Sequence, residues 1–169
     1  MSFLYSRILE YLISSRIKNT NMKKLTFVIT FLIMICSVKG QQTGCVSGSC
    51  DDGKGKYIYA NGYTYEGNFI GSNRSGLGVL TSPGGDVYEG MWENDQFNGQ
   101  GTYKWADGSK YTGEWKNGVQ DGYGIFFYTN GDKYTGYFKN NKFQGKGKYT
   151  WVDGSVQEGI YEDGNYKGN

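Results

Sequence analysis

Hydrophobic and polar residues alternate along short segments of this chain, and glycine interrupts them at regular places. The stretch GTYKWADGSKYTGEW has aromatic residues or glycine at every second position on both sides of Asp107-Gly108, with mostly polar residues between them. A period of two is typical of a β-strand whose faces differ in polarity. Asp-Gly favours a type I′ turn, because this turn needs positive φ at both central residues. The stretch therefore predicts a β-hairpin with strands over 101–106 and 109–115.

The hairpin pattern recurs every 23 residues. Four series of glycines keep this step through five units, beginning at Gly53, Gly55, Gly62 and Gly67. A fixed period of this length predicts a repeat array in which each unit packs mainly on its neighbours. The units begin near residues 53, 76, 99, 122 and 145, with a partial sixth unit at 168. The turns equivalent to Asp107-Gly108 are Asn61-Gly62, Gly84-Gly85, Asn130-Gly131 and Asp153-Gly154.

Alternation gives the predicted sheet one aromatic face and one polar face. Tyrosine stands two residues before the Gly67 series and an aromatic residue two residues after it, so each glycine lies between two rings on one face. Such a glycine leaves room for a ring over the backbone and permits a curved sheet. The polar face carries Lys56, Glu66, Glu89, Lys104, Thr112, Glu114 and Thr135. The segments IGSNRS, ENDQFN, KNGVQD and KNNKFQ are predicted as polar loops between hairpins.

The repeated unit resembles the MORN-repeat family, whose repeat is similar to YEGEWKNGKxHGxGTxxxxDG. The stretch YTGEWKNGVQDGYG is close to that pattern, and the resemblance runs from Asp51 to Asn169. Departures are Gln157 at the tyrosine place, and Arg74-Ser75 and Gln120-Asp121 where the family often has Lys-His. The resemblance implies an all-β fold, an elongated single-layer antiparallel sheet of repeated β-hairpins. It also implies roles in scaffolding, membrane apposition or protein contact.

The chain before the repeats has the pattern of an export signal. From Met22, Lys23 and Lys24 precede a 14-residue apolar run and then small residues, which predicts a signal peptide over 22–40 that is cleaved before Gln41. The run is shorter than the ~20 residues that a membrane-spanning helix needs, although an uncleaved membrane anchor is the alternative. Residues 1–21 are interpreted as a start-site artefact, or else as an extra N-terminal extension with a basic amphipathic helix.

Two cysteines follow the predicted cleavage site. Cys36 lies within the apolar run, and Cys45 and Cys50 lie in a short segment, 41–52, interpreted as a cap before the repeat domain at 53–169. In an exported chain such a close pair predicts a local disulfide. Two free thiols are the alternative if the chain stays in the cytosol.

Charge and composition disfavour several functions. Residues 41–169 carry twelve basic against fifteen acidic residues, so their net charge is near −3, which disfavours nucleic-acid binding. The chain has no histidine, which removes Ser/His/Asp triads, Cys/His pairs and imidazole metal sites. Relatives carry MORN repeats beside lipid kinase or SET methyltransferase domains, but nothing after Asp51 corresponds to either. We therefore expect no catalytic residue, metal site or cofactor.

The aromatic face is the candidate binding surface, because a single-layer sheet has no second layer to cover it. The expected function is a non-enzymatic exported interaction or scaffold module at the cell envelope, periplasmic or secreted, that binds a protein partner and could also pair with a second copy. A membrane-surface or phospholipid-binding module and a glycan-binding module are the alternatives. The candidate contact residues are Tyr65, Phe69, Tyr88, Trp92, Tyr103, Trp105, Tyr111, Trp115, Phe126, Tyr128, Tyr134, Phe138, Tyr149 and Trp151.

Overall fold

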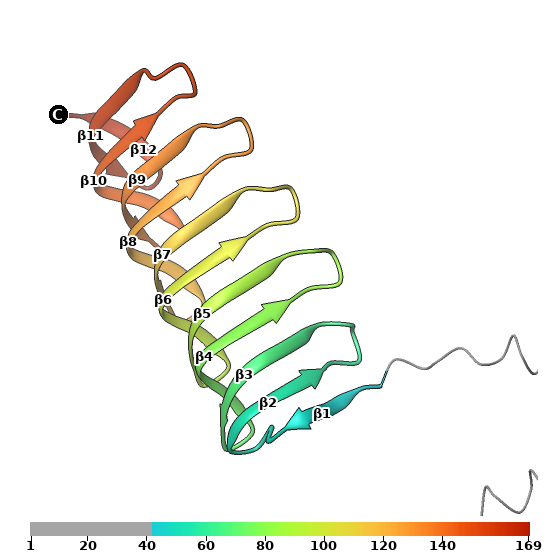
Figure 1. Cartoon of the computed structure of the whole chain (residues 1–169). Helices are drawn as coiled ribbons and strands as arrows, with labels where there is room; N and C mark the ends of the chain where they lie inside the picture. The colour runs from blue at the N-terminus through green and yellow to red at the C-terminus, as the bar shows by residue number, and fades with distance from the viewer. Residues whose placement is uncertain (1–41) are drawn as a thin grey trace, which may run out of the picture. The chain divides into compact units, whose positions relative to one another are not determined.

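Residues 42–169 fold into twelve antiparallel strands that form one sheet, and their order in the sheet follows their order in the sequence (Figure 1). The computed structural model describes residues 42–169, so the predicted extension (1–21) and signal peptide (22–40) lie outside the described residues. The prediction of an all-β, single-layer antiparallel sheet of hairpins is confirmed. The strands are β1 Gly44–Gly48, β2 Gly53–Ile58, β3 Thr64–Ile70, β4 Asn73–Thr81, β5 Val87–Glu93, β6 Gln96–Lys104, β7 Lys110–Lys116, β8 Val119–Phe127, β9 Lys133–Lys139, β10 Lys142–Thr150, β11 Val156–Glu162 and β12 Asn165–Gly168.

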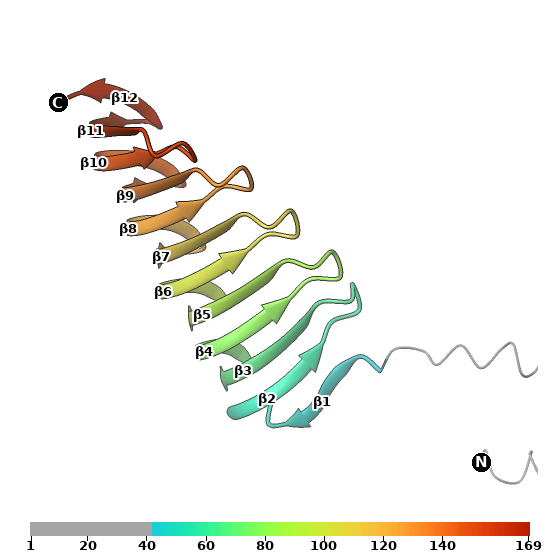
Figure 2. The same cartoon turned by 45° about the horizontal axis from the view of Figure 1, so that its top comes forward.

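The hairpins follow one another along a single axis, and the longer strands curve strongly (Figures 1 and 2). Loops that join β2 to β3, β4 to β5 and so on project from the same side of the sheet. Neighbouring strands make nearly all of the contacts between elements, as expected for a repeat array. Residues 42–169 contain no helix long and apolar enough to cross a membrane.

The hairpin turns differ from the predicted type I′ turns. In the turn between β2 and β3, the Gly62 N–H donates to the Tyr59 carbonyl (2.9 Å), and Gly62 has positive φ while Asn61 does not. The other Asx-Gly turns repeat this geometry, and Gly84 likewise lacks positive φ. This is a type I turn followed by a left-handed glycine, the usual form of a three-residue hairpin loop. The prediction was wrong because Asx-Gly suits both turns, and here the Asx side chain accepts the N–H two residues on, as in Asp107 to Ser109 (2.8 Å).

The segments predicted as polar loops are mostly strand. Only two residues reverse the chain between hairpins, and both have positive φ in all five turns, as in Asn117 (50°) and Gly118 (82°). The tight two-residue turns therefore lie at the opposite ends of the strands from the predicted ones. The rest of KNGVQD belongs to β7 and β8, which pair from Lys116 and Val119 onward. A bulge follows in the first four of these pairs, where the second strand has extra residues that include a glycine of the Gly53 series.

A row of glycines crosses the sheet from β2 to β11. Each strand contributes one glycine, and each glycine is paired with the next across the whole row. The tyrosine two residues before one glycine lies over that glycine and over its partner. For example, a Cβ placed on Gly124 would lie 2.5 Å from the Tyr111 hydroxyl oxygen. The expected space for a ring over the backbone is therefore present. The row consists of Gly55, Gly67, Gly78, Gly90, Gly101, Gly113, Gly124, Gly136, Gly147 and Gly159.

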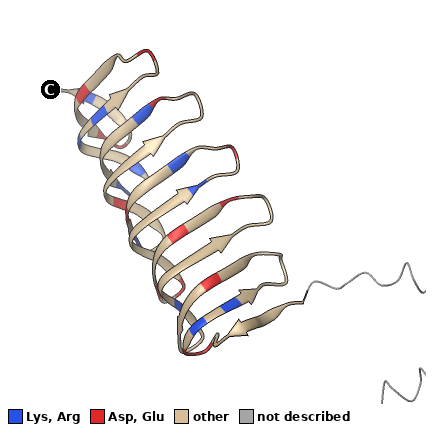
Figure 3. Ribbon diagram, in the orientation of Figure 1, with Lys and Arg blue, Asp and Glu red and all other residues tan. Residues whose placement is uncertain are grey.

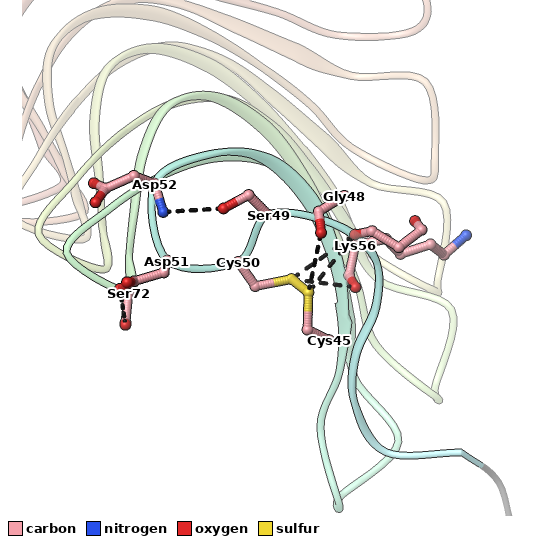
Figure 4. The surroundings of a disulfide bond; sticks show 9 residues. Cys45, Gly48, Ser49, Cys50, Asp51, Asp52, Lys56 and Ser72 are labelled. Atoms are coloured by element: carbon pink, nitrogen blue, oxygen red, sulfur yellow. Dashed lines mark hydrogen bonds between the residues drawn. A yellow bond between two sulfur atoms is a disulfide. The ribbon is translucent and has the colours of Figure 1, made fainter.

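A disulfide closes the first end of this row. Cys45 in β1 is bonded to Cys50 in the loop before β2 (Figure 4). The Ser49 carbonyl oxygen and the Cys50 sulfur lie 2.6 and 2.8 Å from the place of a Cβ on Gly55. In later units a tyrosine ring takes the corresponding place, so the disulfide loop replaces the ring of a preceding repeat. Of the segment interpreted as a cap (41–52), residues 44–50 contribute both β1 and this cover.

Candidate functional site

The fourteen candidate contact residues divide into two groups. Eight of them are almost fully buried, with exposed fractions from 0% for Tyr65 to 5% for Trp115. A flat single-layer sheet would leave these rings open, so the curved strands must enclose them. The eight residues form the core and do not present a contact surface, which corrects the prediction for them. They are Tyr65, Phe69, Tyr88, Trp92, Tyr111, Trp115, Tyr134 and Phe138.

Edge-to-face contacts and backbone hydrogen bonds hold the core rings. Tyr111 meets Trp115 at a centroid distance of 5.1 Å and an interplanar angle of 89°, a favourable aromatic geometry. The Tyr111 hydroxyl donates to the Glu114 carbonyl (2.9 Å), and the Trp115 indole N–H donates to the Gly101 carbonyl (3.2 Å). Replacing Trp115 would therefore test stability rather than binding.

Burial also changes the acidity of the core tyrosines. Loss of hydration raises the pKa of the Tyr65 hydroxyl to about 12. The same cause raises the pKa of Tyr88, Tyr111 and Tyr134 well above the ordinary value for tyrosine. All four phenols are therefore neutral hydrogen-bond donors at physiological pH.

The segments predicted as loops supply core residues that the sequence analysis missed. Phe97 stacks on Tyr88 at 3.7 Å, and Phe143 stacks on Tyr134 at 3.6 Å. Gln120 occupies the equivalent place in the unit between them and is buried. All three stand at the 23-residue step, together with Arg74 and Tyr166. Their 23-residue spacing indicates a repeated structural position. The polar residues on both sides of them instead led to the prediction of loops.

Arg74 takes the stacking place in the first unit. Its guanidinium lies over the Trp92 ring at 4.3 Å from the centroid, a cation–π contact. Its Nε donates to the Asp95 Oδ1 at 2.8 Å, and its backbone N–H donates to the same oxygen at 3.0 Å. Burial would raise the pKa of the Asp95 carboxyl, but the Arg74 hydrogen bonds and charge lower it overall. Arg74 in β4 thus links its strand to β5 and to the turn that follows β5.

The other six candidate residues form a continuous, partly exposed ladder of rings. We call Tyr103, Trp105, Phe126, Tyr128, Tyr149 and Trp151 the ring ladder. Five are half-buried, and Trp151 is 37% exposed. Successive centroids in that order are 4.6, 5.3, 4.7, 5.6 and 4.9 Å apart. The ladder follows the ends of β6, β8 and β10 beside the hairpin turns, and it stops in the earlier unit, where Leu80 and Ser82 replace the rings.

Two aspartate carboxylates link successive hairpin turns beside the ladder. The Asp86 Oδ1 accepts the Ala106 N–H of the next turn at 2.8 Å, and the Asp132 Oδ1 accepts the Val152 N–H at 2.9 Å. The Tyr149 hydroxyl also donates to the Asp132 Oδ2 at 2.9 Å. Trp105 and Trp151 each precede one of these anchored N–H groups. These bonds therefore join the turns of Trp105 and Trp151, at the two ends of the ladder, to the turn before each.

The opposite face is less polar than the sequence analysis expected. Beside the predicted charged and threonine residues it exposes two apolar groups, one around Leu77 and Met91 and one around Tyr123, Tyr137 and Ile160. Tyr123 and Tyr137 are cross-strand partners whose ring centroids lie 5.4 Å apart. These exposed rings offer a control surface for the ladder, since they are aromatic and lie on the other side of the sheet.

The acidic residues of the described chain are spread over the hairpin turns and the strand faces. Within residues 42–169, no cluster of three or more Cys, Asp or Glu side chains is placed to hold a metal ion. The acidic groups with lowered pKa, such as Asp107 and Asp153, accept hydrogen bonds from serines of their own turns. Their shifts therefore have a structural cause.

Comparison with known proteins agrees with the repeat geometry. The family model for the MORN repeat matches residues 52–62, 65–87, 88–110, 111–133 and 134–156. Each of the last four matched segments begins at a core tyrosine and spans one 23-residue step. No curated protein sequence shows significant similarity to the chain. With more than half of its length matched by these segments, the chain belongs to the MORN-repeat family.

Proposed function

We propose that this protein is an exported, non-enzymatic scaffold that binds a protein partner along the ring ladder, at the cell envelope or outside the cell. The observation that carries this proposal is the continuity of six partly exposed rings across three repeats. Contiguous exposed apolar surface usually marks an interaction site. Tyrosine and tryptophan, which make up five of the six rings, are also enriched among residues that dominate binding energy.

Two further features support a scaffold role. The anchored turns keep the ladder rigid, so little conformational entropy is lost when a partner binds. All of the matched segments are MORN repeats, which suggest a repeat-based interaction module. Export is supported by the signal-like segment before Gln41 and by the disulfide between Cys45 and Cys50, a bond typical of oxidising compartments.

We expect the ladder to account for partner capture. The full chain, immobilised, would be used to capture proteins from an envelope or secretory extract of the native source, with quantification by mass spectrometry. A double variant, Trp105→Ala with Trp151→Ala, should lose about tenfold or more of the captured partner, as truncation of central aromatic contacts commonly does. Circular dichroism would check that this double variant, and the control variant described next, remain folded.

The matched control is Tyr123→Ala with Tyr137→Ala, which removes two exposed rings from the opposite face. Capture should be unchanged in this control. If the control lost capture and the ladder variant retained it, the partner would bind the opposite face of the sheet. That result would refute the proposal. Binding to anionic liposomes or to a glycan array that depends on the ladder, without any captured protein, would favour the phospholipid or glycan alternative.

Export makes a separate prediction. Amino-terminal sequencing of the protein isolated from its native source should give Gln41 as the first residue, because the predicted cleavage follows Gly40. A protein that starts at Met1 or Met22 and is recovered from the cytosol would contradict export while leaving the ladder proposal open to its own test.

A further inference from the structure

The ring ladder has a repeat distance that matches one type of extended peptide. Equivalent rings, such as Trp105 and Tyr128, lie two strands apart, which is about 9.6 Å for strands spaced at ~4.8 Å. A polyproline II helix has three residues per turn and a rise of ~3.1 Å, so it repeats every ~9.3 Å. A β-strand ligand repeats every two residues, at about 6.6 Å. Its side chains would therefore not match the ladder's repeat of about 9.6 Å. The three units from Trp105 to Trp151 span about two turns of a polyproline II helix.

Hydrogen-bonding groups on the ladder also suit such a ligand. The indole N–H groups of Trp92 and Trp115 donate to backbone carbonyls in the core. Those of Trp105 and Trp151 have no acceptor within residues 42–169. A polyproline II segment forms no internal hydrogen bonds, so its carbonyls are available to donors on the surface that binds it. Rings for proline packing are thus present in all three units, and free indole donors in the first and the last of them.

The turns beside the ladder carry negative charge. The segments 82–86, 105–109, 128–132 and 151–155 contain four aspartates and no lysine or arginine. In Figure 3 acidic residues colour several of the hairpin loops red, while the blue positions of lysine lie on the adjoining strands. Hydrogen bonds from Ser109 and Ser155 lower the pKa of Asp107 and Asp153, so both are ionised at neutral pH. A ligand along the ladder would therefore gain from positive charge.

We propose that the ring ladder binds a proline-rich segment in the polyproline II conformation that carries arginine or lysine beside its prolines. The segment would belong to the protein partner, so this inference rests on the proposed function and specifies the chemistry of that partner. Prolines would pack between successive pairs of rings, the indoles of Trp105 and Trp151 would donate to ligand carbonyls, and basic side chains would meet the aspartates of the turns.

A synthetic peptide tests the inference with the full chain. The probe has about twelve residues, with proline at two of every three positions and arginine at both ends, which covers the ladder at ~3.1 Å per residue. Fluorescence anisotropy should show saturable binding. A peptide with glycine in place of each proline should bind at least about tenfold more weakly, because it lacks the preformed helix and the rings' packing partners.

Variants separate the contributions of the rings and of the charge. Trp151→Ala, at the exposed end of the ladder, and Trp105→Ala should each weaken binding by about tenfold, while Tyr137→Ala should not. Asp153→Asn keeps the oxygen that accepts the Ser155 bonds but removes the charge, so it should reduce the salt dependence of binding.

Equal binding of the glycine peptide, or full binding by both folded tryptophan variants, would overturn the inference. Ladder-dependent capture of a partner that the peptide cannot displace would refute the polyproline II inference and leave the proposed function standing.

Discussion

Gly113→Ala should unfold the array or destabilise it by about 3 kcal/mol or more. The added Cβ would lie 2.5 Å from the Gly124 Cα, 2.6 Å from the Tyr111 hydroxyl oxygen and 2.7 Å from the Tyr123 carbonyl oxygen. Two of these three atoms are backbone, so no side-chain rotation relieves the clash. Overpacking of a tight core costs about 1–3 kcal/mol and more where the backbone has to move. Urea denaturation followed by circular dichroism measures the loss.

Gly84→Ala is the matched control. Gly84 does not have positive φ, and the nearest atom to its added Cβ is the Ser82 hydroxyl oxygen, at an ordinary contact distance of 3.6 Å. Because alanine restricts the unfolded chain more than glycine, this variant should be neutral or more stable by up to about 1 kcal/mol. If both variants had equal stability, the tyrosine rings could not lie over the glycine row as described.

The protein should lose its stability steeply above pH 10. The four core tyrosines are neutral in the folded state, and their pKa is raised, to about 12 for Tyr65, whereas unfolded tyrosine ionises near pH 10. Their contribution is therefore complete below about pH 10 and declines as the pH rises toward the folded-state pKa. Each tyrosine contributes a slope of about 1.4 kcal/mol per pH unit, so four together give roughly 5 kcal/mol per unit. Urea midpoints between pH 8 and pH 11 measure this slope.

Tyr111→Phe separates ionisation from other effects of high pH. The variant loses the hydrogen bond to the Glu114 carbonyl and so starts about 1 kcal/mol less stable. Its stability should then fall with a slope smaller by about 1.4 kcal/mol per pH unit than that of the natural protein, because one ionising group is absent. An unchanged slope would show that ionisation of Tyr111 is not linked to unfolding.

Much of the fold follows from local patterns in the sequence. The alternation around Gly113 defines a strand, and the 23-residue step places Gly113 opposite Gly101 and Gly124, so the repeat determines the register of the whole sheet. The turn types were predicted less well. Asn117-Gly118 and Asp107-Gly108 are both Asx-Gly pairs, yet only the first forms a two-residue turn with two positive φ angles. The hydrogen bonds between the flanking strands decide the length of each loop. The Asx-Gly pair alone gives no information about these bonds.

The candidate site was predicted only in part, for a related reason. Alternation correctly places Tyr111, Trp115 and Trp105 on one face, but it treats them as equivalent. Curvature encloses Trp115 near the glycine row and leaves Trp105 partly exposed beside the turns. Phe97 was assigned to a loop because its neighbours are polar, although its stacking on Tyr88 completes the core.

The sequence by itself determined the repeat, the strands and the face on which each ring lies, because these depend on spacing along the chain. Only the tertiary structure decided which rings are buried and which form the ladder, since exposure depends on how strongly the sheet curves across strands. It also decided that Arg74, Asp86 and Asp132 link neighbouring repeats, because each bonds to a group about 20 residues away. The ladder therefore arises from repetition, but its exposure arises from curvature.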